Sequence, residues 1–151
     1  MTQRKYILEL ISERGLAGEK HVMTPPEQHR KFAITEYDKY LKKEDNDPQL
    51  VDKSAYQRLV GKLLYLAMTR PAISYAVQTL SQYMYDTKQS HLEGALHVVR
   101  YIKGRTDLGI LLSSDKNNTL KTFCDSDWAF CAAIKKSVTG YYVKFGRSLI
   151  S

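Results

Sequence analysis

The chain has few cysteines, no long apolar run and no excess of acidic residues. Its two cysteines, Cys124 and Cys131, are too few for a disulfide framework, and with no histidine nearby their spacing is not that of a zinc site, so we predict free thiols. No apolar stretch approaches the roughly 20 residues that span a bilayer. The first residues also lack the apolar core of a secretory signal. The sequence therefore argues against export and membrane insertion and favours an intracellular protein, in the cytoplasm or the nucleus.

The composition is that of a globular protein with a basic surface. The 151 residues, 43% of them hydrophobic and 26% charged, fit one domain or two small ones. Lys and Arg number 23 against 16 Asp and Glu, which gives a net charge of +7. This excess suits a polyanionic partner, because binding would release condensed counterions. The basic residues are spread along the chain without a dense block, so an ordinary solvated surface explains the charge as well.

Three apolar patterns with helical spacing follow one another over residues 54–104. The first opens on Ser54-Ala-Tyr-Gln57, which has the form of a capping box. The second begins at Pro71, a residue suited to a first helical turn. The third opens on Ser90-His-Leu-Glu93 and ends at Gly104. The residues we expect to be buried are Leu59, Val60, Leu63, Leu64 and Ala67, then Ile73, Ala76, Val77, Leu80 and Met84, then Leu92, Ala95, Leu96, Val99 and Ile102. The short connections predict a compact bundle.

The regions before and after this bundle carry different patterns. Thr2–Arg14 predicts a short amphipathic helix that ends before Gly15. Residues 18–53 are rich in charge and carry Thr24-Pro25-Pro26, which predicts a linker or extended loop.

The pattern changes to that of strands after residue 104. We predict strands over 108–112, 119–124 and 137–145, with the beginning of another at 147–150. A sheet that stops there has an unpaired edge, so we expect a fragment of a longer domain.

Few residues offer chemistry. The sequence contains no nucleophile elbow, no recognisable Cys–His pairing and no glycine-rich phosphate loop. The four histidines, His21, His29, His91 and His97, include no pair at the i, i+4 spacing that presents two ligands on one helix face. We interpret them as ordinary surface or helix-end histidines.

Asp125 and Asp127 stand at the end of a predicted strand. Their i, i+2 spacing puts both side chains on one face, where paired carboxylates can hold a divalent cation. A strand-end turn, in which Asp bonds its own backbone, explains the same pattern. Trp128, the one tryptophan, is more typical of a core anchor than of a ligand-stacking residue.

Six blocks of sequence become informative when they are taken in order. They are Thr69–Val77, Ser81–Met84, His91 with Ala95, Arg100–Gly104, Asp125–Ala129 and Ser137–Tyr141. Together they resemble the Pol polyprotein of copia-type LTR retrotransposons, and upstream Gln3–Tyr6 and Thr24-Pro25 resemble the segment after its polymerase palm. The resemblance covers nearly the whole chain, from the end of the reverse transcriptase to the beginning of the ribonuclease H domain.

The resemblance implies a fold and a partner. It implies an α+β chain in which residues 1–53 form a helix and linker after the palm, residues 54–104 a three-helix bundle like the thumb and connection, and residues 105–151 a truncated ribonuclease H-like sheet. The implied partner is an RNA–DNA hybrid or another nucleic acid. No membrane partner is implied, and the oligomeric state stays open.

The resemblance also places Asp125 at the first catalytic carboxylate of ribonuclease H. The family's polymerase aspartates, in a Tyr-Val-Asp-Asp motif, would lie upstream of this sequence, and the remaining ribonuclease H carboxylates would lie beyond Ser151. The intact family uses Mg²⁺ or Mn²⁺, but two cations about 4 Å apart need a larger acidic set than Asp125 with Asp127. We therefore expect weak metal binding at these two residues, no cofactor for this chain and no catalysis by it alone.

Two departures from the family pattern favour decay or altered use. Ala72 stands where the family usually has Asp. The helix that begins at Pro71 therefore lacks about 0.3–1 kcal/mol of helix-dipole stabilisation. The apolar residues Phe130–Ile134 replace a small or acidic loop. We interpret the chain as a non-catalytic reverse transcriptase and ribonuclease H fragment with an ancestral role in handling RNA–DNA hybrids. Alternatives are a nucleic-acid-binding module whose Lys and Arg side chains contact phosphates, and a small interaction or effector-type protein derived from the retroelement.

Overall fold

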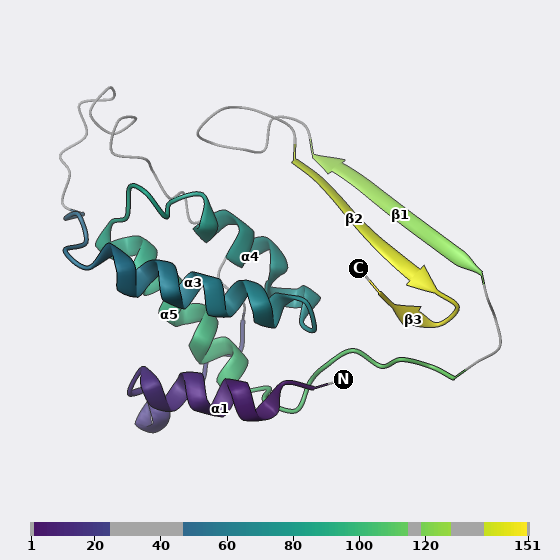
Figure 1. The fold of residues 1–151 in the computed structure, drawn as a ribbon, viewed down its shortest axis with the longest axis horizontal. Helices are drawn as coiled ribbons and strands as arrows, with labels where there is room; N and C mark the ends of the chain where they lie inside the picture. The colour runs from purple at the N-terminus through teal and green to yellow at the C-terminus, as the bar shows by residue number, and fades with distance from the viewer. Residues whose placement is uncertain (1, 25–46, 115–118, 128–137, 151) are drawn as a thin grey trace. The chain divides into compact units, whose positions relative to one another are not determined.

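The computed structural model describes residues 2–24, 47–114, 119–127 and 138–150. The chain divides into two compact units, a helical unit, Thr2–Leu108, and a strand unit, residues 109–151 (Figure 1). Helices and an antiparallel sheet together confirm the α+β class, whereas the likeness to a thumb and to ribonuclease H stays a prediction. Within the described ranges, no helix is both long and apolar enough to cross a membrane.

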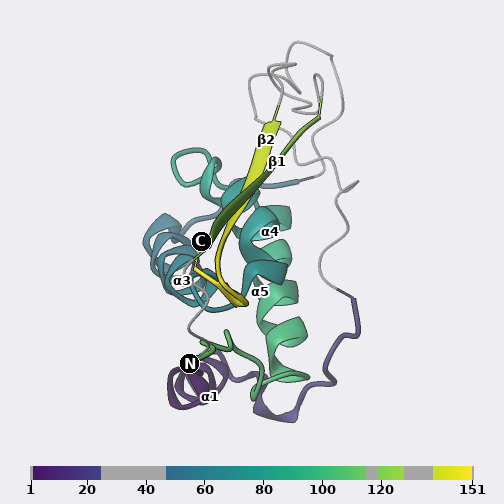
Figure 2. The same cartoon turned by 90° about the vertical axis from the view of Figure 1, so that its right-hand side faces the viewer.

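The helical unit contains the four predicted helices and one short 3₁₀ turn. These elements are α1 (Arg4–Glu13), η1 (Leu16–Gly18), α3 (Lys53–Ala67), α4 (Pro71–Ser81) and α5 (Gln89–Lys103). Gly15 follows α1 with a φ of 67°, a left-handed conformation that favours glycine, and so confirms the predicted stop. Helix α5 packs against α1, α3 and α4 and is therefore the central helix of the unit (Figures 1 and 2).

One apolar core joins the helices of this unit. Its members are Ile7, Leu10, Ile11, Leu16, Tyr56, Leu59, Val60, Leu63, Leu66, Ile73, Val77, Leu80, Ala95, Val98, Val99, Tyr101 and Ile102. The prediction of Leu64 as a core residue is wrong, because 36% of its surface is exposed while Leu63 is fully buried. Successive helical residues are rotated by about 100°, and Leu66 lies nearer the middle of the buried stripe. Ala67, Ala76, Met84, Leu92 and Leu96 are partly buried against the core.

Both predicted capping boxes are wrong, because each helix begins before the serine expected to cap it. The carboxylate of Asp52 accepts a hydrogen bond from the Ala55 amide at 2.9 Å, so α3 begins before Ser54. At α5, the amide and hydroxyl of Ser90 both donate to Asp47, at 3.0 and 2.5 Å. The Lys88 amide donates to Nδ1 of His91 at 3.1 Å.

His91 confirms the interpretation as a helix-end histidine and adds that it is buried. Its side chain is fully buried and stacks on the ring of Tyr83, with the ring centroids 4.2 Å apart. It is a helix-end histidine, as predicted, but it belongs to the interior and not to the surface.

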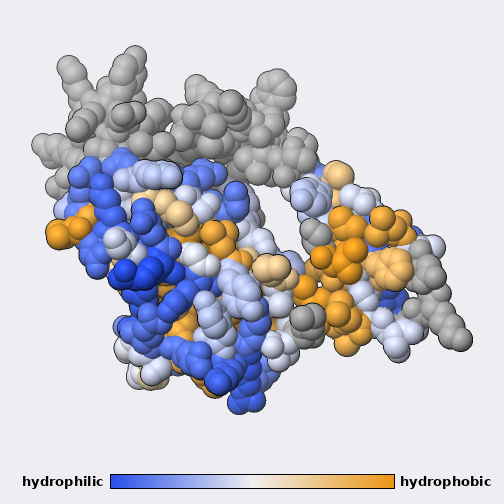
Figure 3. All heavy atoms as spheres, in the orientation of Figure 1, coloured by the Kyte–Doolittle hydropathy of each residue, from blue (hydrophilic) through white to orange (hydrophobic). Residues whose placement is uncertain are grey.

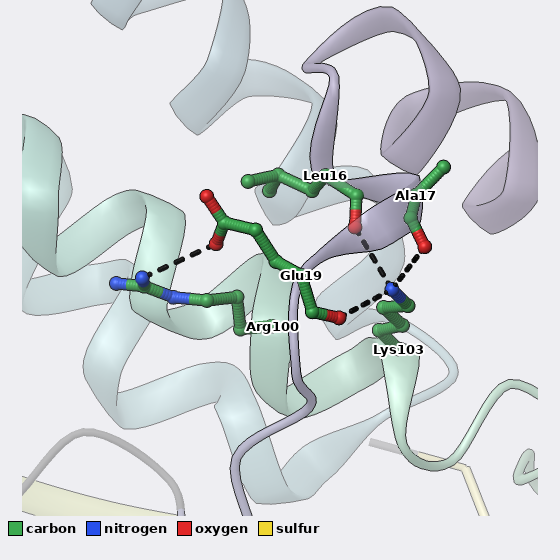
Figure 4. A network of polar contacts seen from close by, with 5 residues as sticks. All are labelled: Leu16, Ala17, Glu19, Arg100 and Lys103. Carbon is green, nitrogen blue, oxygen red and sulfur yellow. Dashed lines mark hydrogen bonds and ion pairs between the residues drawn. The ribbon is translucent and has the colours of Figure 1, made fainter.

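Both ends of the predicted linker are hydrogen-bonded to other parts of the helical unit. Nζ of Lys103 donates to the carbonyls of Leu16, Ala17 and Glu19 at 2.6–2.8 Å, and the guanidinium of Arg100 lies 3.3 Å from the Glu19 carboxylate (Figure 4). At the other end, the Leu50 amide donates to the Thr87 carbonyl at 2.9 Å. Residues 19–24 and 47–52 form no helix, which fits the predicted loop, and the linker itself stays a prediction because residues 25–46 lie outside the described ranges.

The strand unit is a three-stranded antiparallel sheet in the order β1-β2-β3. Its strands are β1 (Leu120–Asp127), β2 (Val138–Phe145) and β3 (Ser148–Leu149). Leu120 is paired with Phe145 and Asp127 with Val138, and Gly146, with a φ of 57°, lies in the turn between β2 and β3.

Three of the four predicted strands are confirmed. Residues 119–124, 137–145 and 147–150 overlap β1, β2 and β3. The strand predicted over 108–112 is wrong, because these residues form no regular element. A short apolar run becomes a strand only when another backbone pairs with it, which the run itself does not encode.

Candidate functional site

The two candidate carboxylates lie on β1, as predicted. Asp125 is exposed and opposite Gly140, and Asp127 is opposite Val138. Because side chains alternate along a strand, the two residues are at positions of the same face. The side chain of Asp127 and all of Trp128 lie outside the description, so the relation between the two carboxylates stays a prediction.

A divalent metal centre does not fit the residues that are described. Among them, no group of three or more His, Cys, Asp and Glu residues could hold a metal ion. Gly140, opposite Asp125 across the sheet, and Phe123, two residues before it on the same face, offer no ligand, and the side chain of Asp127, two residues after it, lies outside the description. Two-metal chemistry needs several carboxylates, and we derive no chemical step through a metal here. Weak cation binding by Asp125 with Asp127 stays a prediction.

An aromatic pair lies beside Asp125 on the same face of the sheet. The rings of Phe123 and Tyr142 stack with centroids 4.7 Å apart and planes 11° from parallel. Nζ of Lys144 is 5.6 Å from the Tyr142 centroid and 6.0 Å from that of Phe123. Both rings are partly exposed, and apolar side chains gather on the visible face of the strand unit (Figure 3). This arrangement can stack a further planar group. The alternation of residues in β1 and β2 was the signal that could have found it.

The Thr-Arg-Pro block of the helical unit has a structural role. The Arg70 side chain is buried, and its guanidinium donates to the carbonyls of Arg105, Thr106 and Leu108 at 2.6–2.8 Å. Burial lowers the pKa of Arg70, while the nearby Asp107 opposes this shift. Arg70 thus holds the segment that follows α5. Ala72, in the first turn of α4, leaves that turn without an acidic residue.

Most cations in the described part of the helical unit are engaged in internal contacts. Lys62 pairs with Glu13, and this hydrogen bond lowers the pKa of the Glu13 carboxyl. Nζ of Lys53 donates to the Tyr85 carbonyl at 3.3 Å, and Lys103 binds the carbonyls already described. Arg58, in contrast, is exposed, and no hydrogen bond or ion pair joins it to another described residue. Few of the described cations of this unit are therefore available to phosphates.

One surface of α3 combines an available cation with an exposed aromatic ring. We call it the α3 face; its residues, all exposed, are Ser54, Arg58, Gly61, Tyr65 and Met68. Their spacing of three and four positions places them along one side of the helix. The sequence contains no Asp or Glu between Asp52 and Asp86, so all of α3 and α4 lacks acidic residues.

The middle of the α3 face is open. A Cβ atom added at Gly61 would meet nothing within 4 Å, so another molecule could approach the helix backbone there. Tyr65 is held edge-on by Tyr6, with ring centroids 5.2 Å apart. The sequence analysis did not find this surface. The missing acidic residues over α3 and α4 were the available signal.

Comparison with known proteins finds similarity to retroelement proteins over the full chain. The chain is 35% identical over 151 residues to the retrovirus-related Pol polyprotein from transposon RE1 of Arabidopsis thaliana, of which it covers 10%. It is 29% identical over 152 residues to the Pol polyprotein from transposon TNT 1-94 of Nicotiana tabacum, covering 11% of that protein. It is 30% identical over 151 residues to an uncharacterized mitochondrial protein of Arabidopsis thaliana, covering 58% of it.

The chain thus spans about a tenth of the length of the Pol polyproteins that it matches. No family model and no solved structure matches it. The order of the sequence blocks described above and the similarity over the full chain agree.

Proposed function

The chain belongs to the family of copia-type retrotransposon Pol polyproteins, and from this premise we propose that it binds RNA–DNA hybrids through the α3 face without cutting the RNA strand. The observation that carries the proposal is an acid-free pair of helices that presents Arg58 and Tyr65 to solvent. An anionic backbone avoids surfaces with carboxylates, because like charges repel at close range. Arg58 would contact a phosphate, and Tyr65 would lie against a sugar or an unpaired base.

Gly61 supports the proposal by its position. It is one helical turn from Arg58 on one side and from Tyr65 on the other, and it has no side chain to keep a sugar–phosphate backbone at a distance. The affinity would depend little on sequence, since such contacts read the backbone and not the base edges. It would fall steeply as the salt concentration rises.

The binding experiment uses a fluorescently labelled RNA–DNA hybrid, with anisotropy measured over a salt series. The parent chain should bind at low salt, and Arg58→Glu should weaken binding and reduce the slope of log K against log salt by about 1. Gly61→Glu should also weaken binding, because it adds a negative charge in the middle of the α3 face. Its Cβ meets no neighbour, so the fold should be kept.

A matched control separates this surface from net charge. Lys20→Glu makes the same charge change at an exposed residue outside α3 and α4, and it should alter binding far less than Arg58→Glu. If Lys20→Glu weakens binding as much as Arg58→Glu, and Gly61→Glu about half as much, net charge explains the affinity and the α3 face does not. No binding by the parent chain at low salt would refute the proposal.

The catalytic part is tested by release of labelled RNA from the hybrid in Mg²⁺ or Mn²⁺. We expect no cleavage by the parent chain or by Asp125→Asn, because one or two carboxylates cannot hold two cations. Metal-dependent cleavage by the parent that Asp125→Asn abolishes would contradict this. It would mean that other groups complete the site around Asp125.

A further inference from the structure

Three cations gather around one carboxylate where the end of α1 meets α3. Nζ of Lys62 donates a hydrogen bond to the carboxylate of Glu13, the last residue of α1. The guanidinium of Arg14 donates to the Ala55 carbonyl at 3.3 Å and so is fastened to the first turn of α3. The hydrogen bond from Lys62 lowers the pKa of the Glu13 carboxyl. The charges of Arg14 and Arg58 also lower this pKa, so both cations lie close enough to act on Glu13.

Lys62 lies beside the α3 face although Glu13 holds its ammonium group. It comes four residues after Arg58 and three before Tyr65, and at both spacings the Cβ atoms on a helix are about 5–6 Å apart. Its side chain is 32% exposed. A phosphate bound to Arg58 would therefore come within reach of Lys62, whose flexible stem of four carbons lets the ammonium group turn toward it.

We propose that Lys62 is a second phosphate-binding residue of the α3 face and that the Glu13 carboxylate takes the place of the phosphate in the free chain. Glu13 is then an internal competitor that lowers the affinity of this surface for an RNA–DNA hybrid. The inference rests on the proposed function, because it concerns the same surface and the same partner. It adds a second cation to that surface and names the residue that limits its affinity.

The exchange of carboxylate for phosphate needs little energy. Both side chains of the Lys62–Glu13 pair are partly exposed, by 32% and 51%. An ion pair in such a position contributes little to stability, because water screens it. A phosphate is also an anion that accepts strong hydrogen bonds from an ammonium group. Glu13 stays attached to α1 after the exchange, however, and its charge repels the incoming phosphate.

Other contacts between α1 and α3 would remain if this ion pair were removed. The hydroxyl of Thr69, just after α3, donates to the side-chain carbonyl of Gln3 at 2.8 Å, and the Tyr6 ring contacts Tyr65 edge-on. Apolar residues of both helices also belong to the one core of the helical unit. Loss of the ion pair should therefore change the binding of nucleic acid and leave the fold intact.

The experiment measures anisotropy of a labelled RNA–DNA hybrid over a salt series for the parent chain, for Glu13→Gln and for the double variant Glu13→Gln with Lys62→Gln. Glu13→Gln should bind roughly five- to tenfold more tightly than the parent near 0.1 M salt. It should also steepen the slope of log K against log salt by about 1, because Lys62 then makes a further phosphate contact. In the double variant the slope should return to that of the parent, since the added contact is missing.

Glu19→Gln is the matched control. It makes the same charge change and likewise frees a paired cation, because the Glu19 carboxylate lies 3.3 Å from the guanidinium of Arg100, outside α1, α3 and α4. This control should leave the salt slope at the parent value. Circular dichroism of each variant should match that of the parent, which shows that the fold is kept.

The outcomes separate this inference from the proposed function. If the parent binds and Glu13→Gln binds with the same affinity and slope, Glu13 is no competitor, while binding by the α3 face stands. An equal gain in Glu19→Gln, or a steeper slope that persists in the double variant, would overturn the role of Lys62. No binding by the parent or by Glu13→Gln at low salt would refute the inference and the proposed function together.

Discussion

The helical and strand units treat their apolar residues in opposite ways. In the helical unit, seventeen residues form one buried cluster. In the strand unit, Phe123, Tyr141, Tyr142 and Phe145 are all exposed, and no apolar residue of its described part is fully buried. A helix has one apolar stripe that neighbouring helices can cover, whereas a sheet has two faces, and each needs a second layer. Among the described residues, the helices therefore provide most of the stability.

The charged residues differ between the units in the same way. Arg70 and Lys103 donate hydrogen bonds to backbone carbonyls and thereby hold the chain around α5. Lys121 and Asp125, in contrast, are exposed on β1. A charge that satisfies internal carbonyls supports the fold, whereas an exposed charge contributes little to it.

The largest effect should come from the core of the helical unit. Leu63→Ala should lower the free energy of unfolding by about 2–5 kcal/mol, since Leu63 is fully buried and the surrounding helices cannot close the cavity. Leu64→Ala, one residue along α3, should cost well under half as much because the side chain is partly exposed. Urea denaturation followed by circular dichroism measures both. A loss below about 0.5 kcal/mol for Leu63→Ala, the size of an ordinary surface change, would contradict the placement of the core.

A smaller effect should come from the buried cation. Arg70→Lys should cost about 1.5–3 kcal/mol, because an ammonium group cannot reproduce the fork that reaches three carbonyls. The same denaturation measurement applies. Arg58→Lys serves as the control on exposed α3 and should change stability by no more than about 0.5 kcal/mol. Equal effects for both variants would show that the Arg70 contacts contribute nothing specific.

Tyr56 should contribute a pH-dependent term of about 1 kcal/mol. Its buried hydroxyl donates to the Leu80 carbonyl at 2.7 Å, and burial raises the pKa of Tyr56 above its ordinary value. The folded state therefore favours the neutral phenol. This contribution is complete below the unfolded pKa, about 10, and is lost as the pH rises from there through the folded pKa. Tyr56→Phe should lower the free energy of unfolding at neutral pH. As the pH rises into the alkaline range, the free energy of unfolding should fall less for this variant than for the parent chain. Parallel alkaline curves for the two proteins would contradict the assignment.

The smallest effect should come from the strand unit. Tyr141 is 65% exposed, and threonine suits a strand as tyrosine does. Tyr141→Thr should therefore change the free energy of unfolding by no more than about 0.5 kcal/mol. Chemical denaturation at low protein concentration measures it. A loss above about 1 kcal/mol, beyond the range of surface changes, would mean that another layer covers this face, and the contrast between the two units would not hold.

Local sequence patterns determined the elements of this protein. The apolar spacing predicted α1, α3, α4 and α5, because a helical stripe is written into residues three and four apart. A β-prone stretch predicted β1, and alternation predicted β2. The two-residue period of a strand placed Asp125 and Asp127 at positions of one face. The ordered blocks indicated the retrotransposon family, which the similarity over the full chain confirms.

Tertiary structure alone decided how those elements begin, end and fasten together. Asp47 reaches Ser90 across 43 positions, Arg70 reaches the chain beyond α5, and Lys103 holds carbonyls more than eighty residues away. The predicted capping boxes did not form, because a polar group bonds with whichever partner the packed chain brings within reach. The exposure of Arg58 and Tyr65 on the α3 face is likewise decided by which helices cover the rest of α3. The apolar period fixes which side of an element is buried, and the fold fixes what each remaining polar group meets.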